Sequence, residues 1–141
     1  MATIKSYTDL EQSKRLANIL ALKSADMYYT PSLIKGHTNY FPHLKRKFPI
    51  DWDIEQAIPC WSLAALLNTL RTFTTSTAFS VKVSAPSLIK TESGYKLIYT
   101  GDYTPMINNG SDVEAPIESI AENAVDACVN MIEKLHELNL L

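Results

Sequence analysis

The chain has 141 residues, of which 46% are hydrophobic and 20% charged, and its formal net charge is −2. A domain of this length buries about 68 to 70% of the surface of its unfolded chain, so it needs no disulfide or metal to hold it together. The acidic pI of about 5.9 differs from the basic footprint of a typical nucleic-acid-binding domain.

The amino-terminal residues MATIKSYTDLEQSKR lack the apolar core of an export signal, so we expect a cytoplasmic protein. The longest apolar window, Ile58 to Leu70, is shorter than the ~20 residues of a membrane span, so we expect no membrane association. Cys60 and Cys128 lie in apolar runs and are interpreted as buried free thiols in a reducing setting. A disulfide between them is the alternative.

The first predicted element is an amphipathic helix from about Asp9 to Leu22. Thr8 and Glu11 have the spacing of a capping box, and the apolar residues that follow recur at helical spacing. A turn and a short extended segment are expected over residues 25–29.

Residues 31–57 show no regular period, so an irregular segment is predicted there. No acidic residue occurs between Asp26 and Asp51. The candidate binding residues of this interval are Lys35, His37, Tyr40, His43, Lys45, Arg46 and Lys47. Basic residues interleaved with aromatic ones can hold a phosphate backbone and stack on bases, so nucleic-acid binding is one interpretation.

The opposite charges of the two halves of the chain favour a second interpretation. Lys and Arg outnumber Asp and Glu by 11 to 6 from Met1 to Thr91, whereas the counts from Glu92 onward are 2 and 9. The acidic half would repel a polyanion. We therefore expect the basic segment to contact protein, either a partner or a second copy of this chain.

A central helix is predicted from Pro59 to Phe73. Proline suits the first turn of a helix, where its missing N–H has no partner in any case. The apolar residues of IPCWSLAALLNTL surround most of the helix, so it should be buried on several sides. We expect Trp61 to meet Met131 and Leu135 in one core.

After this helix the hydrophobic period changes from 3.6 to 2, which is typical of strands. Phe79, Val81 and Val83 predict one strand. The segments 88–91 and 95–100 predict a hairpin, with Gly94 in the left-handed position of a three-residue turn. Tyr95, Leu97 and Tyr99 should share one face of the sheet. An exposed loop is expected over 102–116.

The last predicted element is a helix from about Ala124 to Leu138, with Asn123 as its cap and Asp126 in its first turn. Ile117 and Ile120 keep the same phase, which allows the helix to begin one or two turns earlier. Together these elements predict a single α+β domain over residues 1–141. Its core would be a small antiparallel sheet, built from about Ala78 to Tyr103, with about three helices packed on it.

The search for catalytic and ligand-binding motifs gives no signature. His37 and His43 lack the spacing of a zinc site, the four glycines are widely separated, and Cys60 stands in the most apolar run of the chain. We therefore expect no metal and no cofactor, and the sequence leans against an enzyme. An enzyme whose site is assembled from distant residues stays open.

Four blocks of the chain carry a resemblance to a known group: EQSKRL, ADMYY, IPCWSLAALL and ENAVDACVNMIEKLHEL. They resemble the recurring blocks of a family of small uncharacterised proteins of gut Bacteroidetes, many of them associated with prophages and mobile elements. The resemblance implies a phage or mobile-element setting and supplies no catalytic residues. The expected function is that of a non-enzymatic accessory protein that acts through protein–protein contact.

Overall fold

The computed structural model describes residues 5–31, 40–44, 57–75, 86–99 and 117–137. The described elements are, in chain order, α1 (Leu10–Ala17), the 3₁₀ turn η1 (Leu22–Ser24), β1 (Met27–Pro31), β2 (Tyr40–Leu44), β3 (Ile58–Cys60), α2 (Leu63–Thr75), β4 (Ser87–Thr91), β5 (Gly94–Tyr99), β6 (Ile117–Ala121) and α4 (Ala124–Glu137). The predicted α+β class is confirmed.

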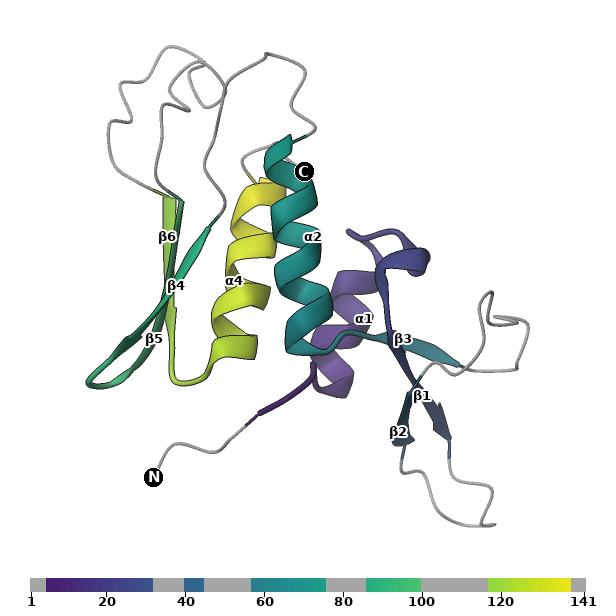
Figure 1. Ribbon diagram of the computed structural model, residues 1–141. Coiled ribbons are helices and arrows are strands. Elements are labelled where there is room, and N and C mark those ends of the chain that lie inside the picture. The colour runs from purple at the N-terminus through teal and green to yellow at the C-terminus, as the bar shows by residue number, and fades with distance from the viewer. Residues whose placement is uncertain (1–4, 32–39, 45–56, 76–85, 100–116, 138–141) are drawn as a thin grey trace.

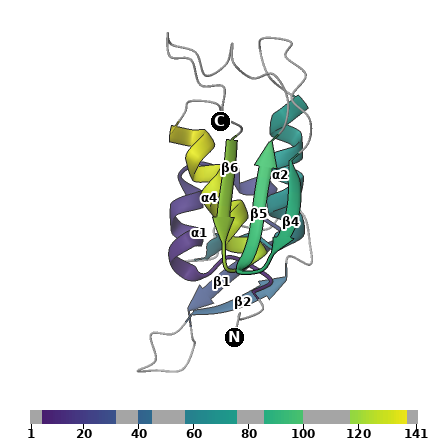
Figure 2. The same cartoon turned by 90° about the vertical axis from the view of Figure 1, so that its left-hand side faces the viewer.

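The strands form two antiparallel three-stranded sheets, one with the order β4-β5-β6 and the other with the order β2-β1-β3. Figures 1 and 2 show the first sheet on one side of the molecule, with α4 and α2 covering one of its faces. Helix α1 and the second sheet lie on the other side of these helices (Figure 1). The sequence predicted one sheet. The second combines β1, which was predicted as an extended segment, with β2 and β3, which were predicted to be irregular and helical.

The second sheet corrects two predictions. Strand β2 lies within the segment 31–57 that was predicted to be irregular, and it pairs with β1. Pro59 lies in strand β3, opposite Tyr28 of β1, and does not begin the central helix. The predicted extended segment before Pro31 is confirmed as β1.

Prolines fit this sheet because of where the ladder places them. Pro42 lies opposite Tyr29 and Pro31 lies opposite Tyr40, so both prolines fall at the same alternate positions of the β1–β2 ladder. Proline has no N–H to donate to a ladder. The donors of alternate residues in an antiparallel strand point to opposite sides, so Pro42 stands where β2 faces outward. The centre of this edge therefore lacks a donor, which disfavours pairing with a further strand.

The capping box of α1 is formed by Asp9 and Gln12, one residue later than the predicted pair. The helix ends at Ala17, five residues before the predicted end. The Asp9 carboxylate accepts from the backbone N–H of Gln12 at 2.8 Å, and the Gln12 side chain accepts from the N–H of Asp9 at 3.1 Å. Thr8, the predicted cap, is fully buried and lies 2.7 Å from the Ser13 hydroxyl.

Helix α2 begins at Leu63 because Ser62 caps it. The Ser62 hydroxyl oxygen accepts from the N–H of Ala65 at 3.2 Å, and its own hydrogen is donated to Asp26. Asp26 also accepts from the backbone N–H of Ser62 at 2.9 Å. One carboxylate therefore fixes the corner between β3 and α2.

Helix α4 has the predicted cap, since the Asn123 side chain accepts from the N–H of Asp126 at 2.8 Å. The possible extension of the helix toward Ile117 is wrong. Residues 117–121 form β6, which pairs with β5 from Ile117 opposite Tyr99 to Ala121 opposite Tyr95. Isoleucines three residues apart suit a helical period, but the strand places Ile117 on the buried face and Ile120 on the exposed one, and tertiary pairing decides the outcome.

The predicted hairpin is confirmed as β4 and β5, although Thr91 pairs with Gly94 and the loop therefore has two residues instead of three. Gly94 has φ +156, and a Cβ built there would lie 2.2 Å from the Ala121 carbonyl oxygen. The predicted strand at 79–84 and the loop at 102–116 lie outside the described residues.

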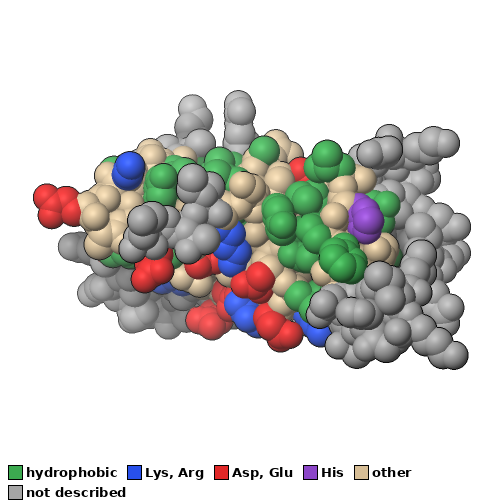
Figure 3. Space-filling model, turned by 90° about the horizontal axis from the view of Figure 1, so that it is seen from below, with side chains coloured by type: hydrophobic (Ala, Val, Ile, Leu, Met, Phe, Trp, Pro, Cys, Tyr) green, Lys and Arg blue, Asp and Glu red, His purple; other side chains and the backbone are tan. Residues whose placement is uncertain are grey.

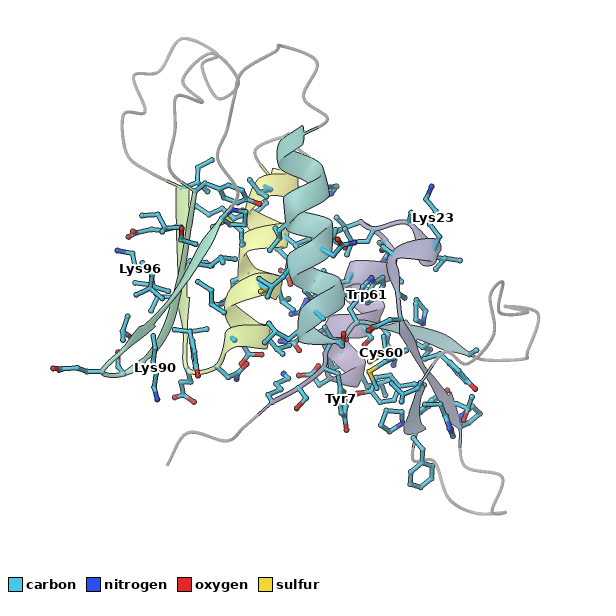
Figure 4. All side chains as sticks on the ribbon, viewed as in Figure 1. Tyr7, Lys23, Cys60, Trp61, Lys90 and Lys96 are labelled. Atoms are coloured by element: carbon cyan, nitrogen blue, oxygen red, sulfur yellow. The ribbon has the colours of Figure 1, made fainter. Side chains whose placement is uncertain are left out.

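The main core lies between the first sheet and the three described helices. Trp61, Met131 and Leu135 are all buried in this cluster, as the sequence predicted, and the Trp61 indole N–H donates to Ser24 at 2.9 Å. A smaller cluster joins α1 to the second sheet around Met27, Tyr29 and Cys60; Figure 4 shows Cys60 and Tyr7 on this side. No helix in the described part is long and apolar enough to cross a membrane.

Candidate functional site

The outer face of the β4-β5-β6 sheet is the strongest candidate surface. Residues of a strand alternate between its two faces, so Leu97, Tyr99 and Ile117 point to the helices and are buried. The outer face, as defined here, consists of Ile89 on β4, Lys96 and Ile98 on β5, and Glu118 and Ile120 on β6.

Two of the three isoleucines on this face are exposed to solvent, and the third, Ile98, is half-buried. Ile89 is 47% exposed and Ile120 59% exposed, and the register places both in one row with Lys96 between them. Figure 4 shows Lys96 pointing away from the helices. Two large aliphatic side chains exposed on either side of one lysine make this sheet face a candidate contact surface.

The two charged side chains of the outer face form an ion pair with each other. The Lys96 ammonium lies 3.0 Å from the Glu118 carboxylate, and the side chains are 33% and 38% exposed. The carbonyl oxygen of Glu118 also accepts from the Lys134 ammonium of α4 at 3.0 Å. This hydrogen bond joins strand β6 to helix α4 behind it.

A cleft of about 760 Å³ opens at the end of the molecule where α2 and α4 begin. It is lined by the β4–β5 turn, by the first residues of both helices and by four charged side chains, Lys5, Lys90, Glu92 and Glu122. The two lysines and the two glutamates give the lining of the cleft no net charge. Figure 3 views the molecule from this end and shows acidic and basic side chains interspersed.

One of the two lysines that line this cleft, Lys5, is already held by other side chains. Lys5 donates to Asp126 at 2.8 Å, to Gln12 at 2.7 Å and to Asp9 at 3.0 Å. Burial acts to lower the pKa of Lys5, but the two carboxylates outweigh it and raise that pKa. Burial acts to raise the pKa of Asp126, but hydrogen bonds from Lys5, Gln12 and Asn123 outweigh it and lower that pKa. This cluster joins the amino-terminal segment to α1 and α4.

The two thiols are structural. Cys60 and Cys128 are free and fully buried, as predicted. Burial raises the pKa of both, that of Cys128 to about 12, and the thiolate is the form that attacks and that binds metals. Cys60 is held in a polar cluster, where its sulfur lies 3.5 Å from the Thr8 hydroxyl.

The predicted binding residues are only partly described. Tyr40 and His43 lie on β2, three residues apart, and therefore on opposite faces of the second sheet. Tyr40 packs against the smaller core cluster. His43 is exposed, stacks on Tyr28 with ring centroids 5.2 Å apart and hydrogen-bonds Thr30 at 2.8 Å. The other five, Lys35, His37, Lys45, Arg46 and Lys47, lie outside the described residues.

Sequence reasoning missed the outer face. Its signal was present in β5, because placing Tyr95, Leu97 and Tyr99 on one face leaves Lys96 and Ile98 on the other. The decisive neighbour, Ile120, was assigned a helical phase. Among the described residues no group of three or more His, Cys, Asp or Glu side chains could hold a metal ion.

Comparison with protein-family models, with curated proteins and with solved structures found no match.

Proposed function

We propose that this protein is a non-enzymatic binding protein that acts through protein–protein contact on the outer face of the β4-β5-β6 sheet. The observation that carries the proposal is the exposure of Ile89 and Ile120, 47% and 59%, on a sheet whose other face is covered by helices. Covering such side chains gains roughly 25 cal/mol for each Å² of apolar surface removed from water.

The reactive groups of the described residues support binding over catalysis, because structural contacts use them. Asp26 fixes the start of α2, Asp126 belongs to the Lys5 cluster, and the two thiols are buried. A catalytic group needs access to its substrate, which the buried thiols lack, and the two carboxylates already hold structural partners.

We further propose that the protein works in the cytoplasm as an accessory protein of a phage or mobile element. The support for the genetic setting is the resemblance of the four sequence blocks. The support for the compartment is a pair of free, buried thiols, which suits a reducing environment.

Site-specific photo-crosslinking tests the proposed function. A photoreactive phenylalanine analogue replaces Ile120 in one variant and, as the matched control, Leu22 in another. Leu22 is 42% exposed but lies in η1, away from the outer face. In cells that express the variants we expect protein adducts from position 120 and few from position 22. Equal or absent adducts at position 120 would contradict the proposal.

Binding to a labelled oligonucleotide at low salt tests the nucleic-acid alternative. We expect no binding that depends on the basic segment. Tight binding that falls steeply with salt, and that is lost when Lys45, Arg46 and Lys47 are replaced by alanine, would overturn the proposed function in favour of nucleic-acid recognition.

A further inference from the structure

Two charged and two apolar residues of the outer face form a four-residue block on β5 and β6. Lys96 stands opposite Ile120, and Ile98 stands opposite Glu118. The two charged side chains therefore occupy one diagonal of the block, and the two isoleucines occupy the other. The 3.0 Å contact between the Lys96 ammonium and the Glu118 carboxylate runs along the charged diagonal.

This order makes the block complementary to itself. A two-fold axis along the Ile98–Ile120 diagonal brings each isoleucine against its own copy and exchanges the positions of Lys96 and Glu118. Each ammonium of one copy then faces a carboxylate of the other. No charge meets a like charge in this arrangement.

Sheet dimensions allow this axis. Neighbouring strands lie about 4.8 Å apart, and residues on one face follow each other about 6.6 Å along a strand. With these spacings both isoleucines lie within about 1.5 Å of a line that exchanges Lys96 and Glu118. The strands of the two copies then cross at a steep angle, which belongs to the orthogonal class of sheet packing.

We propose that the occupant of the outer face is a second copy of this chain, docked face to face about this two-fold axis. This inference rests on the proposed function and names its partner. Charge complementarity selects the occupant, because the face is neutral as a whole and its charges match only a surface with the same alternation. A purely cationic partner would repel Lys96, and a purely anionic partner would repel Glu118.

The contact is weak because the face is small. Three strands of about five residues cover roughly 17 Å by 14 Å, or about 240 Å². A standard stable interface buries about 800 Å² on each partner. Dimers therefore form as protein concentration rises, and the experiment must extend to several hundred micromolar, where weak self-association is measured.

Charge-swap variants test the axis directly. In K96E both charged positions of the block become acidic, and in E118K both become basic. Each variant then opposes like charges twice in the dimer, so its self-association should weaken roughly tenfold relative to the wild type. An equimolar mixture of the two variants restores both attractions. We expect a heterodimer at least as strong as the wild-type dimer.

Sedimentation equilibrium over a concentration series is the measurement, with K90E as the matched control. Lys90 is an exposed lysine of the same hairpin that lies outside the outer face, so K90E should dimerise like the wild type. Circular dichroism confirms that each variant is folded.

Two results would overturn the second-copy proposal: a wild type that stays monomeric throughout the series, or a mixture of K96E and E118K no stronger than either variant alone. Adducts from position 120 to a different protein would then leave the proposed function standing without the second copy. Absent adducts would remove both.

Discussion

Replacing Gly94 by alanine should destabilise the sheet that carries the outer face. The added Cβ would lie 2.2 Å from the Ala121 carbonyl oxygen and 2.8 Å from the Glu122 Cα. Both neighbours are backbone atoms, so the clash cannot be relieved by turning a side chain. The end of β6 must move by about 1 Å to reach van der Waals distance.

The expected cost combines two effects. Overpacking of a fitted contact costs about 1 to 3 kcal/mol, and a non-glycine residue held at φ +156 adds about 1 to 3 kcal/mol of backbone strain. G94A should therefore lower the free energy of unfolding by about 2 to 6 kcal/mol, because Tyr95 pairs with Ala121 in the ladder that must shift.

Urea denaturation followed by far-UV circular dichroism measures this change. The matched control is S93A, which alters the exposed residue beside Gly94 in the turn and should stay within about 0.5 kcal/mol of the wild type. A G94A protein as stable as S93A would refute the close approach of β6 to the turn.

Three further predictions concern the core, the Lys5 cluster and the thiols. L66D should prevent folding because Leu66 is fully buried, and a monodisperse product with unchanged circular dichroism would contradict the core. Asp126 has a lowered pKa in the folded state, so its stabilisation is present above the unfolded pKa of about 4 and is lost as the pH falls through the folded value. D126N should cost about 1 to 2 kcal/mol at pH 7 and flatten the acid limb of stability measured against pH. Cys60 and Cys128 should react with a thiol reagent only after denaturation, and fast labelling of the native protein would contradict their burial.

The sequence predicts helices better than it predicts sheets in this protein, for a physical reason. The apolar stripe of α4 repeats over 14 residues, so local periodicity identifies this helix, and Asn123 marks its start. Strands β3 and β6 have three and five residues, too few for a period to be distinguished. Their identity comes from pairing with β1 and β5, which are distant in sequence.

The candidate site was hidden for the same reason. Ile89, Lys96 and Ile120 form one row only after three strands are placed in register, and no local pattern contains that register. The predicted set in the basic segment was chosen by composition, and Tyr40 and His43 show its weakness, since composition does not tell which face of a strand a residue occupies.

The most direct test of the proposed dimer is thiol cross-linking at the symmetry axis. Ile120 lies close to the proposed axis, whereas Ile89 lies on the same face two strands away from it. With a short bifunctional thiol reagent, the proposed dimer predicts that native I120C becomes a covalent dimer far faster than native I89C, while the buried native thiols stay unlabelled. Equal rates for the two variants, or no dimer from I120C at high concentration, would contradict the proposed dimer.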